Sequence, residues 1–191
     1  MPEWKRPSST DTVIAHISDL HFGARNQTDC WEITARFLRE EVQPALILAT
    51  GDIVDSPSGR TYDKAKQALD ALQTPYYVCA GNHDRHIKGN VLRKVARLMG
   101  RGDTAALFDQ KFTFRVALPD NLKPETIGRW QVGILGVDSS IDADYSARGY
   151  LNPKMFPDLE RKALNPDLDL VILLVHHHLQ QIGRASCRER V

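Results

Sequence analysis

Four short polar clusters in this chain each follow an apolar, β-branched run. In order along the chain they are Asp19-Leu20-His21, Gly51-Asp52, Gly81-Asn82-His83-Asp84 and His176-His177-His178. Carboxylate, amide and imidazole groups therefore recur at the points where strands are expected to end. In an open α/β sheet the carboxyl ends of the strands form one edge, and ligands bind in the crevice beside it. The pattern predicts an α/β fold whose functional side chains gather at one sheet edge.

The spacing of apolar residues predicts alternating strands and helices in the first half of the chain. We expect strands over 12–18, 45–50 and 75–80, and helices over 29–42, 61–72 and 90–99. The continuous apolar run at 45–50 is typical of a strand that is buried on both faces. Such an alternation is typical of parallel βαβ units.

The pattern changes after residue 108. Strands are expected over 111–118 and 129–137, joined by a loop that contains Pro and Asn, as an antiparallel hairpin or as part of a second sheet. A helix is expected over 153–164, where Pro157 must fall in the first turn or break the helix. The last strand is expected over 168–175.

Composition excludes several classes of protein. With 191 residues, 42% of them hydrophobic and 26% charged, the chain has the material for one soluble domain with a core. A formal net charge of +1 gives no domain-wide basic excess, so a nucleic-acid partner is not expected. No apolar stretch approaches the roughly 20 residues of a membrane span, and the N-terminus lacks the apolar segment of a secretory signal. Cys30, Cys79 and Cys187 are widely spaced and form no disulfide framework, so a cytoplasmic location is expected.

Three segments are expected along the chain. Residues 1–11 are polar and rich in Pro and Ser, which predicts a loose tail, and one domain follows over 12–181. Residues 182–191 have no apolar periodicity and a sudden excess of arginine. This last segment resembles the translation of a common short-read sequencing adapter, and we interpret it as non-native. A natural basic tail is the alternative.

The first two clusters carry metal-ligand chemistry. In extended backbone, residues two apart point the same way, so Asp19 and His21 can offer an oxygen and a nitrogen to one metal ion. The alternative is a loop carboxylate beside an ordinary surface histidine. Asp52 follows Gly51, which allows a tight turn, and its two oxygens can bridge two ions. A turn or helix cap is the alternative for Asp52. Asp55 is expected either to contact the metal ligands without binding the ion itself or to act as a cap, and the cap is favoured.

The third and fourth clusters add an amide and imidazoles. Asn82 can offer a neutral carbonyl oxygen to a metal ion, and His83 can hydrogen-bond a phosphate oxygen or a leaving group. Asp84 is expected to orient the imidazole of His83 and favour its charged form. A turn without catalytic content is the alternative. At least one residue of the run 176–178 is expected at the sheet edge, although neighbouring strand residues face opposite ways and cannot all bind one ion.

Together the clusters resemble the calcineurin-like metallophosphoesterases over residues 12–181. The matching segments are Ile17-Ser18-Asp19-Leu20-His21, Gly51-Asp52-Ile53-Val54-Asp55, Gly81-Asn82-His83-Asp84 and Val175-His176-His177-His178. Their layout looks most like the bacterial branch that includes 3′,5′-cyclic nucleotide phosphodiesterases. The resemblance implies a four-layer α-β-β-α sandwich, with an incomplete second sheet in this chain.

The resemblance also implies a role for each residue. The first metal ion would be held by Asp19, His21 and Asp52, the second by Asp52, Asn82 and His176, with His83 as the catalytic histidine and Asp84 as its partner. Mixed nitrogen and oxygen ligands suit Mn, Fe, Zn or Co. The family has a later Gly-His-x-His motif that this sequence lacks. That departure indicates a C-terminally truncated domain and leaves an inactive fragment or a non-catalytic interaction module as an alternative.

The expected activity is hydrolysis of a phosphodiester by a hydroxide that bridges two metal ions and attacks phosphorus in line. A cyclic nucleotide is a candidate substrate, and the partner is then a small phosphodiester. A phosphomonoesterase or a nuclease on the same fold is the alternative enzyme. The sequence leaves a homodimer open.

Overall fold

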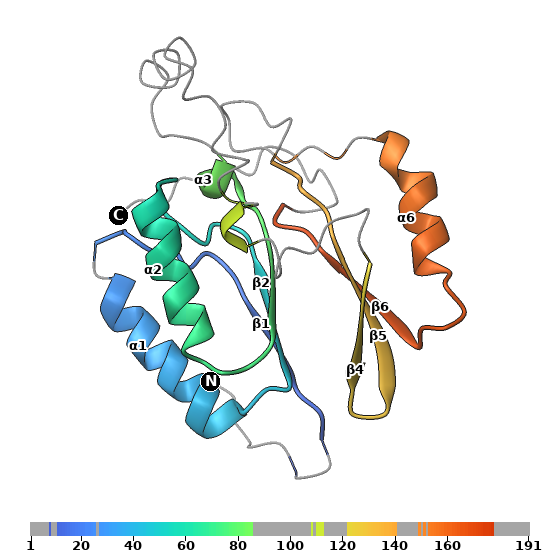
Figure 1. Ribbon diagram of the computed structural model, residues 1–191, viewed down its shortest axis with the longest axis horizontal. Helices are drawn as coiled ribbons and strands as arrows, with labels where there is room; N and C mark the ends of the chain where they lie inside the picture. The colour runs from blue at the N-terminus through green and yellow to red at the C-terminus, as the bar shows by residue number, and fades with distance from the viewer. Residues whose placement is uncertain are drawn as a thin grey trace, which may run out of the picture.

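The computed structural model describes residues 8, 11–25, 27–85, 108, 110–112, 122–140, 149, 151 and 153–177. These residues form two three-stranded sheets that lie face to face between helices, in four layers across Figure 1. The predicted α/β fold with an α-β-β-α order of layers is confirmed. The predicted helix at 90–99, His178 and the segment 182–191 lie outside the described residues.

The first sheet is wholly parallel. Its strands are β1 (Ile14–Ile17), β2 (Leu46–Thr50) and β3 (Tyr76–Cys79), in the spatial order β1-β2-β3. The crossovers contain α1 (Gln27–Phe37), which continues as the π-helical turn Leu38–Val42, and α2 (Gly59–Asp70). The βαβ units predicted from the sequence are therefore confirmed.

Local signals set the ends of these helices. Beyond the π turn, Gln43 adopts the left-handed conformation with φ 48°, donates its N–H to the carbonyl of Leu38, and is followed by Pro44. The helix α2 begins after Ser58, whose side chain and that of Thr61 form a reciprocal capping box. The cap of α2 is therefore Ser58, and the favoured prediction that Asp55 is a cap was wrong.

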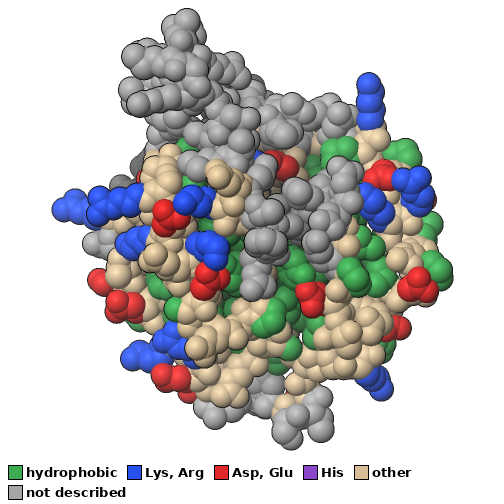
Figure 2. Space-filling view, viewed as in Figure 1, with side chains coloured by type: hydrophobic (Ala, Val, Ile, Leu, Met, Phe, Trp, Pro, Cys, Tyr) green, Lys and Arg blue, Asp and Glu red, His purple; other side chains and the backbone are tan. Residues whose placement is uncertain are grey.

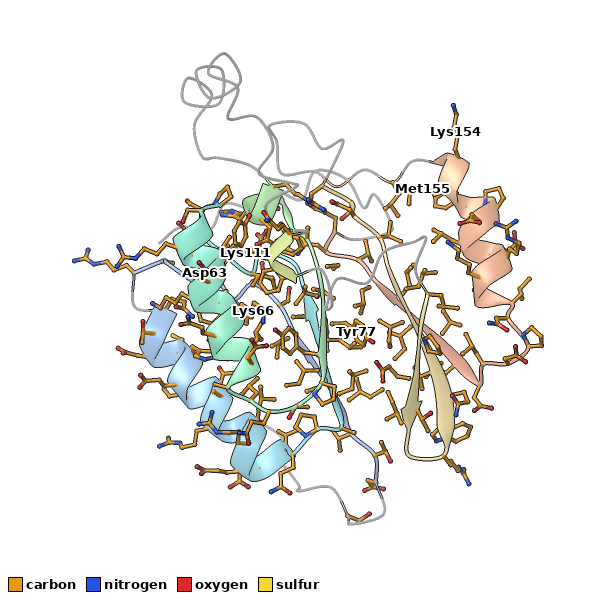
Figure 3. All side chains as sticks on the ribbon, in the orientation of Figure 1. Asp63, Lys66, Tyr77, Lys111, Lys154 and Met155 are labelled. Carbon is orange, nitrogen blue, oxygen red and sulfur yellow. The ribbon has the colours of Figure 1, made fainter. Side chains whose placement is uncertain are left out.

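The alternation of side chains along the first sheet produces two separate cores. In β2, Ile47 and Ala49 pack with α1 and α2, whereas Leu46 and Leu48 face the second sheet. Between the sheets, Tyr77 of β3 packs in the second core, where Figure 3 labels it, and its hydroxyl donates a hydrogen bond to the carboxylate of Glu125. The continuous apolar run of β2 is explained because both of its faces are buried.

The second sheet is mixed. Its strands are β4 (Lys123–Ile127), β5 (Trp130–Gly136) and β6 (Leu170–Leu174), with β4 antiparallel and β6 parallel to β5. The predicted strand at 111–118 was wrong in its described part, because residues 111 and 112 are helical. The hairpin partner of β5 lies instead at 123–127, within the segment predicted as the joining loop.

Two features explain that misplaced strand. Pro124 lies in β4, and proline is tolerated there because β4 is at the edge of the described sheet. The hairpin turn is only the two residues Gly128 and Arg129, with Gly128 at φ +62°, where glycine has no steric penalty.

Another helical segment lies on the outer face of the second sheet (Figure 1). It begins with the 3₁₀ turn Pro153–Met155 and continues as α6 (Phe156–Ala163), with Pro157 in the first turn as predicted. Every residue of α6 is exposed or half-buried. Among the described residues, none of the helices has the length and apolar character needed to cross a membrane.

Candidate metal centre

The four clusters meet at one edge of the molecule. The N–H of Asp19 donates to the carbonyl of Gly51 (3.2 Å), the N–H of His21 to that of Asp52 (2.9 Å), and the N–H of Gly51 to that of Cys79 (3.1 Å). These bonds join the segments that follow β1, β2 and β3. In Figure 1 the short helix α3 (Asn82–Arg85) marks this edge at the end of β3.

The backbone at this edge is strained. Asp19, His21 and Asp52 have φ values of 56°, 46° and 50°, in the left-handed region that residues other than glycine rarely adopt. Such conformations cost about 1–3 kcal/mol each and concentrate at functional sites. The sequence argument that Asp19 and His21 point the same way because they lie two apart in extended backbone was therefore wrong, since neither residue lies in extended backbone.

Two glycines let the segments approach closely. A Cβ atom on Gly51, at φ +73°, would lie 2.3 Å from Nδ1 of His176. A Cβ atom on Gly81 would lie 2.2 Å from Oδ1 of Asp52 and 2.3 Å from its backbone nitrogen. Both glycines are therefore required by space at the edge, which explains the Gly-Asp and Gly-Asn-His-Asp patterns.

Asp52 lies at the centre of the site, 4% exposed. Its Oδ2 is 3.9 Å from Nε2 of both His21 and His83, and its Oδ1 is 3.5 Å from Nε2 of His176. Burial acts to raise the pKa of Asp52, but hydrogen bonding and charge from His176, together with the N–H of His83, outweigh it and the pKa lies below its ordinary value. Asp52 is thus held as a carboxylate among three imidazoles.

Potential ligand side chains lie in two groups, each of which can hold a metal ion. One contains Asp19, Asp52 and His176, and the other contains His21, Asp55 and His83, with the ligand atoms of each group within 4.8 Å of one another. Nε2 of His21 also lies 4.0 Å from Oδ1 of Asp19. The predicted aspartate and histidine ligands are therefore brought together, although the two groups differ from the two predicted sets. Asn82 is half-buried at the start of α3.

The histidines are oriented as metal ligands usually are. Nδ1 of His176 lies 3.0 Å from the carbonyl of Thr50, and Nδ1 of His83 lies 3.0 Å from the carbonyl of Asp55. A ligating histidine commonly donates one ring N–H to a carbonyl, which leaves the other nitrogen for the ion. Nδ1 of His21 is buried and has no hydrogen-bond partner among the described residues. The donor set therefore fits divalent cations with mixed nitrogen and oxygen ligands.

His176 is strongly coupled to Asp52. Burial acts to lower the pKa of His176, but the hydrogen bond and the charge of Asp52 raise it to about 9. The negative charge at the edge therefore attracts a cation, here a proton, and a metal ion would have to replace that proton.

Asp84 has a different role from the predicted one. Its fully buried carboxylate accepts the N–H groups of Ile53 (3.2 Å), Val54 (2.9 Å) and Gly81 (2.9 Å). The predicted contact with the ring of His83 was wrong, because that ring meets the carbonyl of Asp55 instead. Burial raises the pKa of Asp84 to about 7. Asp84 therefore joins the segments after β2 and β3 by hydrogen bonds to their backbone and holds the two segments of the site together.

Asp55 takes the less favoured of its two predicted roles, beside the metal ligands. Its Oδ1 lies 3.9 Å from Nδ1 of His21 and 4.0 Å from Nδ1 of His83, so it contributes negative charge beside both rings. The signal for this position was present, since Asp55 follows Asp52 by three residues in the loop after a buried strand.

The comparisons with known proteins agree with this fold. A sequence model of the calcineurin-like phosphoesterases matches residues 12–189. The chain therefore belongs to the calcineurin-like phosphoesterase family, as the four clusters predicted.

Individual relatives carry more specific names. The probable glycerophosphodiester phosphodiesterase GpdQ of Arcobacter nitrofigilis is 28% identical over 90% of this chain and 59% of its own length. The glycerophosphodiester phosphodiesterase GpdQ of Enterobacter lignolyticus is 32% identical over 91% of this chain and 59% of its own length. A probable cyclic nucleotide phosphodiesterase of Moraxella catarrhalis is 36% identical over 37% of this chain and 27% of its own length. The chain spans 59% of the length of the two relatives that match most of it.

Proposed function

We propose that this chain carries the metal-binding face of an enzyme that hydrolyses a small phosphodiester. The observation that carries the proposal is the environment of Asp52, a buried carboxylate within 4 Å of imidazoles from three separate segments. Family membership supports the same chemistry, because the matched family is one of phosphoesterases.

The proposed metal ligands are those expected from the resemblance. Asp19, His21 and Asp52 would hold one divalent ion, and Asp52, Asn82 and His176 would hold the other. Two bound ions supply positive charge for a phosphate and make water acidic enough to act as a nucleophile near neutral pH. The ion at each position is Mn, Fe, Zn or Co, because these metals accept both imidazole and carboxylate ligands.

His83 is the proposed acid–base group. Its ring is a quarter exposed, Nδ1 is held by the carbonyl of Asp55, and Nε2 points to the side of Asp52. When the ring is protonated, Nε2 can donate a hydrogen bond to a phosphate oxygen or a proton to the leaving oxygen. The carboxylates of Asp52 and Asp55 lie 3.9 Å and 4.0 Å from the two ring nitrogens of His83.

The substrate we favour is a glycerophosphodiester. Both relatives that match about nine-tenths of this chain are named glycerophosphodiester phosphodiesterases, whereas the one named for cyclic nucleotides matches 37%. Cyclic nucleotides are the second candidate. On the face shown in Figure 2, basic and acidic side chains of the described residues are mixed over α1 and α2. This part of the surface therefore has no continuous basic stripe that could bind a nucleic acid.

The test is a metal-dependent hydrolysis assay. The Mn²⁺-loaded protein is offered bis-p-nitrophenyl phosphate, p-nitrophenyl phosphate, glycerophosphoethanolamine and 3′,5′-cyclic AMP, with the Enterobacter relative as positive control. We expect turnover of the diesters that EDTA and Asp52→Asn abolish, and that the surface substitution Asp63→Asn leaves unchanged. Turnover of the monoester alone would favour a phosphomonoesterase. Mn²⁺ binding without any turnover, while the positive control is active, would favour a non-catalytic module.

A further inference from the structure

Asp138 and Ser139 follow β5 at the edge where the candidate metal centre lies. Ser139 is 1% exposed, and the side chain of Asp138 is 15% exposed. Two neighbouring polar side chains with so little exposure at the end of a strand need specific partners. Asp138 and Ser139 each have a partner, and the two partners lie on different segments of the site.

The partner of Asp138 is Arg85. Its guanidinium nitrogen lies 2.6 Å from Oδ2 of Asp138, and the arginine side chain is only 5% exposed. Arg85 is the last residue of α3, which begins with Asn82 and His83, and its guanidinium also lies over the ring of Phe108 at 5.3 Å. A buried ion pair tolerates little displacement, because either charge alone in the interior is unfavourable. The pair therefore fixes α3, on the first sheet, to the end of β5, on the second.

The partner of Ser139 is His177. The Oγ of Ser139 lies 2.7 Å from Nδ1 of His177 and also accepts the N–H of that residue at 3.3 Å. The ring of His177 meets the ring of His176 with centroids 4.8 Å apart. A Cβ atom on Gly149 would lie 2.2 Å from Cβ of His177, so the side chain is enclosed on that side too. Ser139 therefore fixes the histidine next to a proposed metal ligand.

We propose that Asp138 and Ser139 are positioning residues that set the separation between the turn bearing Asn82 and His83 and the strand end bearing His176. The dipeptide that follows β5 holds both segments, one through an ion pair and the other through a hydrogen bond. Its effect on catalysis rests on the proposed function, whereas its effect on geometry does not.

The first experiment needs no metal. Imidazole ¹H–¹⁵N spectra of the protein in EDTA are compared for wild type, Ser139→Ala, Ser139→Thr and Ser58→Ala. Ser58 caps α2, and its side chain bonds to Thr61 of that helix rather than to a histidine, so its loss tests the effect of lowered stability. We expect Ser139→Ala to shift the ring signals of both His177 and His176, Ser139→Thr to restore them, and Ser58→Ala to leave them unchanged. A shift confined to His177 would overturn the proposal.

The second experiment measures Mn²⁺ affinity by electron paramagnetic resonance. Ser139→Ala and Asp138→Asn should weaken binding of one ion about tenfold or more, the effect typical of removing a partner that orients a ligand. Asp63→Asn is the matched control, since the Asp63–Lys111 ion pair has the same 2.6 Å length and lies on the surface of α2 (Figure 3).

The outcomes separate the two proposals. An equal loss of affinity in Asp63→Asn and Ser58→Ala, or none in Ser139→Ala, would overturn the positioning role. A wild-type protein that binds no Mn²⁺ while Ser139→Ala still shifts both rings would refute the proposed function and support the positioning of His176. If Asp138→Asn does not fold, Ser139→Ala still decides the question.

Discussion

Substituting Gly81 by alanine should damage the fold and the metal centre together. The new Cβ would lie 2.2 Å from Oδ1 of Asp52, 3.0 Å from its Cγ and 2.3 Å from its backbone nitrogen. A turn of the aspartate side chain cannot relieve the overlap, because the backbone nitrogen is also too close. The segments after β2 and β3 must therefore move apart by about 1 Å to reach ordinary contact distances.

The structure allows the cost to be estimated. Forcing a methyl group into a packed site costs about 1–3 kcal/mol. Separation of the two segments also stretches the bonds that join them, from the N–H of His83 to Asp52 (2.9 Å) and from the N–H of Val54 to Asp84 (2.9 Å). A buried donor without its acceptor costs about 1–3 kcal/mol. The free energy of unfolding should fall by about 2–6 kcal/mol in total.

Urea titration followed by circular dichroism measures this loss. With a slope of about 2 kcal/mol/M, the midpoint should fall by about 1–3 M. Gly59→Ala is the matched control, because a Cβ atom there meets nothing within 4 Å at the first residue of α2. It should unfold at the wild-type urea concentration or slightly above. A midpoint for Gly81→Ala within error of wild type would refute the close approach of Gly81 to Asp52.

Three further substitutions test other parts of the structure. Gly51→Ala, at φ +73° and 2.3 Å from the ring of His176, should weaken Mn²⁺ binding in a titration at least tenfold; wild-type affinity would contradict the contact. Asp84→Asn replaces one of two oxygens that accept three backbone N–H groups, so in EDTA at pH 5 the free energy of unfolding should fall by about 1–3 kcal/mol. Burial raises the pKa of Asp84 from 3.8 to about 7 in the folded protein, so the free energy of unfolding of the wild type falls as the pH rises from 3.8 to 7. The difference in free energy of unfolding between wild type and Asp84→Asn should therefore be smaller at pH 8 than at pH 5. A difference that does not change with pH would contradict this. Ser58→Ala should lower the free energy of unfolding by about 1 kcal/mol through loss of the capping box, and an unchanged thermal midpoint would show that the cap contributes nothing.

Periodicity predicted the first sheet well because its apolar pattern and its burial have the same cause. Residues 45–50 read as a buried strand, and β2 is buried on both faces by α1, α2 and the second sheet. The edge between strands and loops was also predictable, since Asp52 and His176 follow such runs directly. The strand β4 could not be predicted, because Pro124 and Gly128 are residues typical of loops. An edge strand nevertheless tolerates a proline.

The contacts of the site could be predicted only in part. The polar clusters indicate which segments meet, but the partner of each side chain depends on backbone geometry that has no periodic signal. Left-handed conformations at Asp19 and Asp52 are one example. Asp84 is another example. The sequence suggested its neighbour His83 as the partner, but its carboxylate accepts hydrogen bonds from the N–H groups of Ile53 and Val54.

The central claim is that Asp52 lies between two divalent cations. Anomalous diffraction from crystals grown with Mn²⁺ tests it most directly, because the scattering counts the ions and locates their ligands at once. We expect two peaks at the sheet edge, both with a carboxylate oxygen of Asp52 among their ligands and one with His176. A single peak, or peaks that Asp52 does not contact, would contradict the claim.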